Sequence, residues 1–411
     1  MKLSKFKNEP FTDFSKKKNA QEFEKALGKV TARFNKEYPN TIGGEKFFTE
    51  KKHYSYNPSS KEEIVGVFQK GTAEMAIKAV EIANNTFHDW KNVPVKKRVK
   101  FLIEAAKIMR KRKHEFSAMM VYEVGKNWAE ADGDTAEAID FMEYYAREML
   151  RYDHGMSVVS NPGEKNKCEY IPLGVGVVIP PWNFPLAILA GMTTAAVVTG
   201  NTVVLKPSSD SPAIAQMFFE LLEEIKLPKG VVNFLVGDGS AIGDLIVTHP
   251  LTRFISFTGS MEVGLRINEL AAKKQPTQIW IKRVVAEMGG KDSIFVDSEL
   301  IDFNDAVKGT VQAAFGYQGQ KCSACSRVIV DEKIYDKFCA ALVEETKKIK
   351  VGATKFNPNM GPVINEKSKN SITDYIKKAI DEGGKIIHGG MELSDNGYFI
   401  QPTIIRDVDR D

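Results

Sequence analysis

Cys322 is the residue of this sequence best suited to covalent chemistry. It lies in the segment Phe315-Gly-Tyr-Gln-Gly-Gln-Lys-Cys-Ser-Ala-Cys325, after two glycines and directly beside Lys321. Glycines let backbone N–H groups approach a bound substrate, and a nearby positive charge favours the thiolate, the nucleophilic form of cysteine. A buried structural cysteine is the competing interpretation and the commoner one for a cysteine taken at random. The segments upstream favour a nucleophile.

Two polar side chains upstream have the types that attack on a carbonyl carbon requires. Asn183 lies between two prolines in Pro181-Trp-Asn-Phe-Pro185, and a neutral amide can stabilise a developing oxyanion. An asparagine that only forms a turn is an equal alternative. Glu287 follows the apolar run Val284–Ala286, and a carboxylate at the end of a buried strand tends to have the raised pKa of a general base. An ion-paired structural glutamate is the competing interpretation.

Two other segments are suited to a ligand that carries phosphate. The segment Phe254–Gly264 contains a strand, a glycine turn and a helix start, so the helix N-terminus could face a phosphate. Its glycine spacing differs from the three-glycine dinucleotide fingerprint, and a plain strand-to-helix connection is an equal alternative. Lys206 follows the predicted strand Thr202–Leu205, which places a cation at the carboxyl end of a parallel strand. Open α/β sheets bind their ligands at that end.

These residues need a framework that brings distant segments together, and the sequence predicts a parallel sheet. From Gly174 onward, short β-branched runs alternate with helical segments, which is typical of doubly wound α/β proteins. The predicted strands are Val175–Ile179, Thr202–Leu205, Val231–Val236, Phe254–Phe257, Ser293–Val296 and Arg327–Val330. Paired glycines after Met288 mark the predicted domain junction. We therefore expect one domain over residues 1–288 and a second over residues 289–411.

The region before the sheet is predicted to be mainly helical. Apolar residues recur at helical spacing in several stretches. The predicted helices cover residues 15–37, 72–90, 94–121 and 128–150. Thr72 is suited to cap the second helix, and Pro94 is suited to the first turn of the third. The short strand Ile64–Phe68 and the turn-rich residues before it indicate an antiparallel fringe.

Composition narrows the possible classes of protein. With 411 residues the chain is long enough for two or three domains, and its net charge of +4 gives no reason to expect a nucleic-acid or anionic-membrane partner. The longest apolar run, Leu186–Val198, is too short to span a bilayer. Four cysteines fit a reducing compartment, and the lysine-rich N-terminus lacks the apolar stretch of a signal peptide. We expect a cytoplasmic protein.

Taken together, these motifs resemble those of the aldehyde dehydrogenase superfamily. The matching stretches are Pro-Trp-Asn183-Phe, Lys206-Pro-Ser, Phe-Thr-Gly259-Ser with Gly264, Glu287-Met-Gly-Gly-Lys and Gly-Gln-Lys-Cys322. They occur in the family's order and at its spacings, and the resemblance covers the chain from about residue 40 onward. It implies an α/β fold with doubly wound parallel sheets, in which residues 1–288 form an N-terminal arm and an NAD-binding domain and residues 289–411 belong to the catalytic domain.

The resemblance also implies a reaction. The Cys322 thiolate attacks an aldehyde carbon, the Asn183 amide and the Cys322 backbone N–H hold the oxyanion, and hydride passes to a nicotinamide. Water activated by Glu287 then hydrolyses the thioester to a carboxylate. Within the superfamily, the chain most resembles the branch that oxidises L-glutamate γ-semialdehyde to L-glutamate in proline and arginine breakdown. The cues are Asn8–Phe14, Ala136–Phe141 with Tyr144–Arg147, and Phe-Gly-x-x-Gly-Gln-Lys-Cys-Ser-Ala around Cys322.

The same resemblance implies NAD as cofactor. The residues implied in binding it are Lys206, Ser208, Ser209, Pro181, Trp182, Gly259, Ser260 and Gly264. Ser209 stands where NAD-preferring members often carry an acid, which leaves tolerance of NADP open. For the substrate, Ser323 is implied to contact the carboxylate, Glu137 the amino group, and Phe184 to wall the aldehyde pocket. A solvent-facing Glu137 and a core Phe184 are the alternatives.

Two features depart from the family pattern. The chain ends at Asp411, where family members continue, so we expect the C-terminal part of the catalytic domain to be missing and the chain alone to be poorly soluble or weakly active. A homo-oligomer is expected for the full-length family member. Cys325 stands where a small residue is expected and forms C-x-x-C with Cys322. A reversible disulfide and inert packing are its alternatives, while zinc is disfavoured because a second pair is absent and the histidines are scattered.

Other functions compete with this interpretation. The same chemistry would serve another ω-oxo acid such as succinate semialdehyde. An inactive nucleotide-binding relative is favoured by the missing C-terminal part and opposed by Cys322, Asn183 and Glu287 together. A cysteine hydrolase is the weakest option, because no histidine lies in any of these motifs to pair with Cys322. Exact substrate, cofactor preference and oligomeric state are left open by the sequence.

Overall fold

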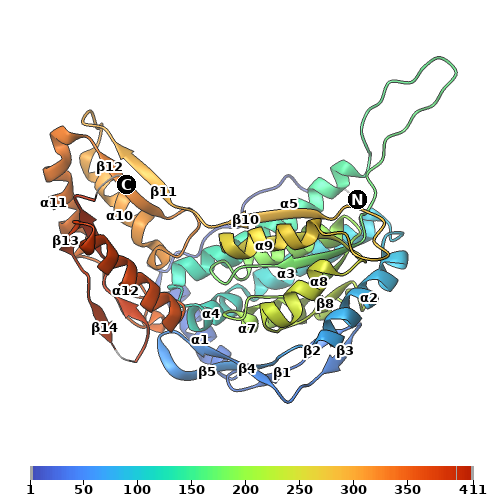
Figure 1. The fold of residues 1–411 in the computed structure, drawn as a ribbon, viewed down its shortest axis with the longest axis horizontal. Coiled ribbons are helices and arrows are strands. Elements are labelled where there is room, and N and C mark those ends of the chain that lie inside the picture. Colours follow the sequence, from blue (N-terminus) through green and yellow to red (C-terminus); the bar gives the residue numbers. More distant parts are fainter. Residues whose placement is uncertain (1–2, 395, 409–411) are drawn as a thin grey trace. The chain divides into compact units, whose positions relative to one another are not determined.

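The computed structural model describes residues 3–394 and 396–408 of the chain (Figure 1). This part of the chain divides into two compact units. The first unit contains the described residues up to Ser55 together with Val65–Met119 and Asp132–Met288. The second unit contains Tyr56–Ile64, Met120–Ala131 and the described residues from Gly289 onward. The last change of unit along the chain lies between Met288 and Gly289.

A seven-stranded sheet forms the centre of the first unit, in the order β10-β9-β6-β7-β8-β2-β3. Its strands are β2 (Asn40–Ile42), β3 (Glu45–Phe47), β6 (Val175–Ile179), β7 (Thr202–Leu205), β8 (Val232–Phe234), β9 (Thr252–Gly259) and β10 (Arg283–Met288). From β10 to β8 each strand is parallel to the next, and β2 runs antiparallel to both β8 and β3. The predicted parallel sheet is confirmed, and β6 and β7 have the predicted bounds.

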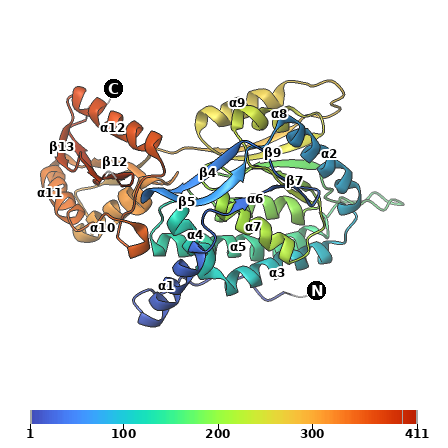
Figure 2. The same ribbon diagram turned by 90° about the horizontal axis from the view of Figure 1, so that it is seen from below.

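Helices cover both faces of this sheet (Figure 2). On one face lie α2 (Ala73–Trp90), α8 (Asp244–Thr248) and α9 (Met261–Ala272), which close a core of small and branched apolar side chains over β6, β7 and β9. On the other face lie α6 (Ala187–Val198) and α7 (Pro212–Glu224), with α3 (Val95–Lys111) and α5 (Trp128–Tyr152) beyond them. Burial on both faces explains why β6 and β7 read as continuous apolar runs rather than as alternating ones.

The N-terminal region differs from its prediction in three respects. Helix α1 is shorter than expected, covering Lys17–Thr31. The helix expected over residues 94–121 is two helices, α3 and α4 (Lys113–Glu123), which part at Arg112, and Pro94 is the N-cap rather than a first-turn residue. The fringe is a three-stranded sheet in the order β1-β5-β4, formed by β1 (Glu37–Tyr38), β5 (Ser60–Gln69) and β4 (Lys52–Asn57), and β1 is parallel to β5. The antiparallel prediction is wrong for that pair.

Thr72 caps α2 as expected, because its side chain accepts a hydrogen bond from Met75 N.

The second unit is built on a β-α-β arrangement. Strand β11 (Asp292–Val296) is parallel to β12 (Cys325–Val330), and α10 (Phe303–Phe315) and α11 (Tyr335–Thr346) pack with them around a small apolar core. Helix α12 (Glu366–Asp381) follows. Two small antiparallel pairs complete the unit: β13 (Lys385–His388) with β16 (Ile404–Arg406), and β14 (Glu392–Ser394) with β15 (Phe399–Ile400).

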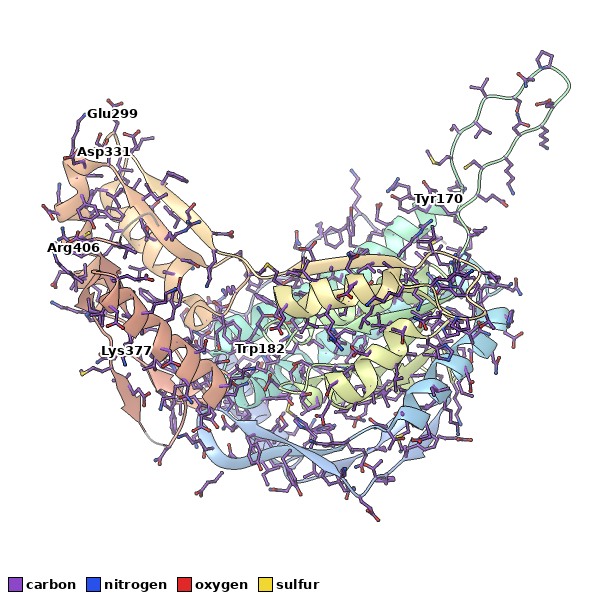
Figure 3. All side chains as sticks on the ribbon, in the orientation of Figure 1. Tyr170, Trp182, Glu299, Asp331, Lys377 and Arg406 are labelled. Atoms are coloured by element: carbon purple, nitrogen blue, oxygen red, sulfur yellow. The ribbon has the colours of Figure 1, made fainter. Side chains whose placement is uncertain are left out.

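Residues 153–174, between α5 and β6, form a long excursion whose base is marked by Tyr170 (Figure 3). A single bridge between Met156 and Cys168 joins its two limbs, and Val159 at 95% and Ile171 at 79% are largely exposed. Among the helices of the described residues, none combines the length and the apolar character that crossing a bilayer requires.

Candidate active site

The carboxyl ends of four parallel strands carry most of the predicted site residues of the first unit. Along the sheet these ends follow the order β7, β6, β9, β10. The chain leaves β6 through α6 toward β7 on one side, and later returns from β8 through α8 to β9 on the other side of β6. Such a reversal of strand order opens a crevice between the strand ends, where α/β sheets of this type bind ligands. The predicted residues that lie there are Pro181, Trp182, Asn183, Phe184, Lys206, Ser208, Ser209, Gly259, Ser260 and Glu287.

Lys206 is the most buried charged group at these strand ends. It directly follows β7, its backbone N–H donates to Val178 O of β6 at 2.9 Å, and its side chain is only 6% exposed. Burial lowers the pKa of Lys206 to about 8, against the opposing attraction of Asp238. A donor with this little contact with water is suited to hydrogen-bond the hydroxyls of a ligand that fills the crevice.

Helix α9 begins at the end of β9 and turns its N-terminus to the same edge of the sheet. Ser260 is the N-cap, and its hydroxyl accepts from Val263 N at 3.3 Å. The N-terminus of such a helix carries a partial positive charge and free N–H groups, which fit a phosphate. Gly264 has a different reason to be glycine: a Cβ there would lie 2.4 Å from the Met288 sulfur. It allows α9 to pack closely on β10, and its predicted role in cofactor binding stays a prediction.

The loop between β6 and α6 carries Asn183. Asn183 and Phe184 are half-buried, and Asn183 Oδ1 accepts from Phe184 N at 3.0 Å. Trp182, also half-buried, precedes them (Figure 3). The loop therefore presents the amide of Asn183 close to the strand end, as its position in the sequence predicted. Its role as an oxyanion donor stays a prediction.

Ser208 and Ser209 form the turn that follows Lys206. The Ser208 hydroxyl accepts from Asp210 N at 3.3 Å, and the carbonyl of Ser209 lies 2.6 Å from Nε2 of His53. Both serines are half-buried. These contacts shape the turn, and the predicted role of the two serines in cofactor binding stays a prediction.

The burial expected for Glu287 is wrong. In β10 exposed and half-buried residues alternate, and Glu287 belongs to the exposed set. The cause is the position of β10 at the end of the sheet, where β9 is its single strand neighbour in the described part of the chain. Its side chain is therefore exposed to solvent, in contrast to the burial expected from the apolar run Val284–Ala286.

In the second unit, Cys322 and Ser323 lie between α10 and β12, and both side chains are exposed. The positive charge expected beside Cys322 is already engaged, because Lys321 Nζ lies 2.7 Å from the Glu130 carboxylate and forms an ion pair with it. The thiol is thus accessible to a substrate. The backbone carbonyl oxygen of Cys322 lies very close to Gly290. A Cβ at position 290 would be only 1.8 Å from this oxygen.

A left-handed turn precedes Cys322 and holds it in place. Tyr317, Gln318 and Gly319 have φ angles of 50°, 59° and 70°, a conformation that costs about 1–2 kcal/mol for each non-glycine residue. The buried Tyr317 donates to Val124 O at 3.0 Å, and Gln318 Nε2 donates to Gly125 O at 2.9 Å and Pro362 O at 2.7 Å. These bonds offset the strain and tie the turn to two other segments of the unit.

Cys325 is buried at the start of β12. Burial raises the pKa of its thiol, which donates to Arg327 O at 3.3 Å. In this position the thiol fills space within the β11–β12 pair. The four cysteines are all free thiols.

Two residues of functional interest were missed by sequence reasoning. Gln318 is one of them. It adopts a left-handed backbone conformation that is usual for glycine, so its residue type does not indicate this conformation in the sequence. Asp134 is the other: it is 1% exposed and accepts from Ala187 N at 2.6 Å. Its signal was an acid on the helical face that also carries Ala138 and Phe141. Glu137 lies on the same helix, α5, and is exposed, so its role in substrate binding stays a prediction.

The first unit has the architecture of a nucleotide-binding α/β protein, and the second unit presents an accessible thiol. The chain belongs to the aldehyde dehydrogenase family, whose family model matches residues 48–411. A protein of Bacillus mycoides (strain KBAB4), named 1-pyrroline-5-carboxylate dehydrogenase, is 54% identical over 411 residues, which cover 99% of this chain and 79% of that relative. A protein of the same name from Bacillus cytotoxicus is also 54% identical, with the same coverage.

Solved structures are similar as well. A point mutant of Thermus thermophilus 1-pyrroline-5-carboxylate dehydrogenase superposes with a TM-score of 0.97 at 45% identity, covering 100% of this chain and 79% of that one. A structure of 1-pyrroline-5-carboxylate dehydrogenase from Thermus with bound NAD has a TM-score of 0.97 at 44% identity, with the same coverage. The α/β aldehyde dehydrogenase fold is thereby established for this chain.

Proposed function

We propose that this chain catalyses the NAD-dependent oxidation of L-glutamate γ-semialdehyde, the open form of 1-pyrroline-5-carboxylate, to L-glutamate. The observation that carries the proposal is the 54% identity, over 99% of the chain, to a protein named for that reaction. This similarity is not confined to a cofactor site, because it includes the segments of both compact units. Such a reaction belongs to the breakdown of proline and arginine.

In the proposed mechanism, Cys322 supplies the thiolate that bonds to the aldehyde carbon. The amide of Asn183 and the backbone N–H of Cys322 donate to the oxyanion of the resulting thiohemiacetal. When the carbonyl reforms, the carbon loses a hydride and a thioester remains on Cys322. Glu287 accepts a proton from water, which attacks the thioester and releases the carboxylate and the thiol. The exposure of Glu287 allows its proton to pass to solvent afterwards.

The residues at the strand ends of the first unit fit NAD. The buried Lys206 matches the ribose hydroxyls of its adenosine, and the N-terminus of α9 at Gly259 and Ser260 matches its pyrophosphate. When bound, the nicotinamide accepts the hydride from the substrate. Pro181, Trp182, Ser208 and Ser209 are proposed to line this site, and the serine at 209 leaves NADP tolerance open. Gly264 acts through the packing of α9 on β10.

For the substrate we propose three contacts. The exposed hydroxyl of Ser323 donates to the α-carboxylate, the Glu137 carboxylate accepts from the amino group, and Phe184 packs beside the aliphatic carbons. We further propose that residues 1–288 and 289–411 are the cofactor and catalytic domains, in line with the change of compact unit after Met288. A cytoplasmic location is proposed, which the free thiols fit, and a homo-oligomer is proposed for the full-length family member.

The proposal is tested by following the absorbance of reduced nicotinamide. The purified chain is supplied with NAD and with either glutamate γ-semialdehyde or succinate semialdehyde at matched concentrations. We expect kcat/KM to be at least about tenfold higher for the glutamate derivative, since one lost hydrogen-bonded group typically costs this much. A preference for succinate semialdehyde would reassign the substrate to another ω-oxo acid. Binding of NAD without turnover of either aldehyde would favour an inactive nucleotide-binding relative.

A further inference from the structure

We propose that Asp134 is a positioning residue for Asn183. From α5 it holds the first residue of α6, and through α6 it holds the loop of residues 180–186 on which Asn183 lies. This inference rests on the proposed function, in which the Asn183 amide stabilises the oxyanion. It adds to that function a buried carboxylate outside the reacting groups.

Helix α6 needs an acceptor that its own sequence does not supply. Its N-cap residue is Leu186, whose side chain forms no capping hydrogen bond. The first N–H groups of a helix have no partner within the helix, and a buried N–H without a partner costs about 1–3 kcal/mol. Ala187, the first residue of α6, is fully buried and therefore cannot turn to water instead.

Asp134 provides the missing acceptor from a different helix. Its Oδ1 accepts from Ala187 N at 2.6 Å, and its side chain is 1% exposed. A carboxylate at a helix N-terminus is also favoured by the helix dipole, and hydrogen bonds to charged acceptors are short and strong. Further along the two helices, a Cβ at Gly191 would lie 3.0 Å from the Phe141 ring, so α5 and α6 are closely packed there. The hydrogen bond of Asp134 is therefore one point at which α5 meets α6, and Phe141 against Gly191 is another.

The loop that carries Asn183 is held at both ends. Its first end is Ile179 of β6, a strand with β9 on one side and β7 on the other. Its second end is Ala187. Three prolines, at positions 180, 181 and 185, restrict the backbone between these ends. Because the loop has little freedom of its own, release of Ala187 would shift Asn183, which is four residues away.

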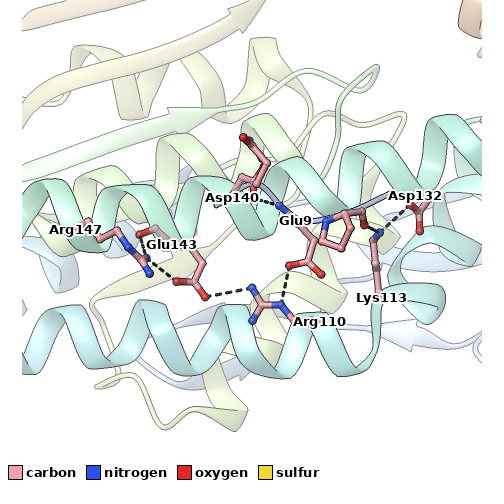
Figure 4. Close-up of polar contacts among 9 residues, drawn as sticks. Glu9, Arg110, Lys113, Asp132, Asp140, Glu143 and Arg147 are labelled. Carbon is pink, nitrogen blue, oxygen red and sulfur yellow. Dashed lines mark hydrogen bonds and ion pairs between the residues drawn. The ribbon is translucent and has the colours of Figure 1, made fainter. Parts of the chain in front are cut away.

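Asp132 provides a matched control on the same helix (Figure 4). It is also an aspartate and also 1% exposed. Its carboxylate accepts from Lys113 Nζ at 2.8 Å and from the backbone and hydroxyl of Thr12 at 2.7 and 2.6 Å. These contacts join α5 to the N-terminal segment and to α4, and do not involve the loop. Loss of Asp132 therefore tests general damage to α5, whereas loss of Asp134 tests the loop.

The kinetic experiment uses the 411-residue chain with the variants Asp134→Ala, Asp134→Asn and Asp132→Ala. We expect Asp134→Ala to lower kcat by about 10- to 100-fold, less than the roughly 10²–10³-fold expected from complete loss of an oxyanion donor, with the KM for NAD within about twofold of wild type. Asp134→Asn keeps an acceptor oxygen and should recover kcat to within about threefold. In an Asn183→Ala background, Asp134→Ala should have little further effect on kcat.

Hydrogen–deuterium exchange provides a readout that is independent of activity. Exchange at Ala187 and its loop should be faster in Asp134→Ala than in wild type, and unchanged in Asp132→Ala. Equal loss of kcat in the two alanine variants, or full additivity with Asn183→Ala, would overturn the inference. Exchange at Ala187 that stays at the wild-type rate in both Asp134→Ala and Asp134→Asn would also overturn the inference. A wild-type chain that oxidises a different aldehyde refutes the proposed substrate alone, and the same variants are then compared on that aldehyde.

Discussion

Lys206 and Cys322 are held in opposite ways. Lys206 is enclosed at the end of a strand that is buried on both faces, and burial itself changes its chemistry by lowering its pKa to about 8. Cys322 is exposed, and its position depends on a strained backbone turn tied down by Tyr317 and Gln318. A group that binds a cofactor can lie deep in the fold, whereas a nucleophile has to meet its substrate. An exposed reactive side chain has few packing contacts to hold it, so its position must be fixed by the backbone that carries it.

The largest effect is expected for Cys322→Ala. Loss of the nucleophile should lower kcat/KM by roughly 10⁴-fold or more, while NAD affinity, measured by titration calorimetry, stays within about twofold. Cys168→Ala is the control, since that thiol is also exposed and free. If Cys322→Ala kept a tenth of the activity, the thiol would not be the nucleophile and the contrast with Lys206 would lose its basis.

Glu287→Gln should lower kcat by about 10²–10⁴-fold. The hydride leaves before water attacks, so a rapid burst of reduced nicotinamide of one equivalent per chain should persist in this variant. Stopped-flow absorbance separates the burst from the slow steady state. Glu262→Gln is a control at an acid of the first turn of α9. A variant without the burst would place Glu287 at an earlier step than thioester hydrolysis.

Lys206→Met should raise the KM for NAD roughly tenfold, the equivalent of about one hydrogen bond. It should also change stability with pH. Because the folded pKa of about 8 lies below the ordinary 10.5, the unfolded chain binds the proton more tightly, and burial of the charge costs up to about 3 kcal/mol below pH 8. That cost is relieved as pH rises from 8 to 10.5. The variant should therefore be more stable than wild type at pH 7, and its advantage should shrink at pH 9.5, as measured by urea denaturation.

Lys282→Met is the matched control for this prediction. Burial lowers the pKa of Lys282 to about 8 as well, but its ammonium donates to Val247 O at 2.7 Å. Its loss leaves a buried carbonyl without this donor, so the variant should be less stable than wild type, with an unchanged KM for NAD. A rise in the KM for NAD in Lys282→Met equal to that in Lys206→Met would show that general destabilisation, not a cofactor contact, explains both.

The smallest effect is expected for Cys325→Ala. The buried Cys325 thiol, with its raised pKa, is a poor partner for disulfide exchange. Untreated activity should stay within about threefold of wild type, and inactivation by hydrogen peroxide should proceed at the wild-type rate and be reversed by dithiothreitol. Loss of that reversibility in the variant would instead show a disulfide between Cys322 and Cys325 in the wild-type chain.

Predictions from the sequence were most accurate where the local residue pattern alone determines the structure. Strands β6 and β7 were predicted to the residue, because each is a short β-branched run with clear ends, Gly174 and Pro180 for β6 and Asn201 and Lys206 for β7, and both lie between layers of helices. Placement of Asn183 and Lys206 at strand ends followed from those bounds. The parallel sheet followed from the alternation of strands and helices.

The failures have causes that lie far away in the sequence. The exposure of Glu287 depends on β10 being the last strand of the sheet, which its apolar run Val284–Ala286 does not reveal. The pairing of Lys321 depends on Glu130, from another segment. The break at Arg112 lies within a run of helix-forming charged residues, where local propensity predicts continuity.

The two glycines after Met288 differ in the space available for a side chain. A Cβ at Gly289 would meet open space, whereas one at Gly290 would lie 1.8 Å from the Cys322 carbonyl oxygen. In a saturation library scored for function, position 289 should accept many amino acids, and position 290 should accept glycine almost alone. A dipeptide that looks like a flexible hinge thus contains one replaceable residue and one whose missing side chain makes room for the backbone carbonyl of Cys322.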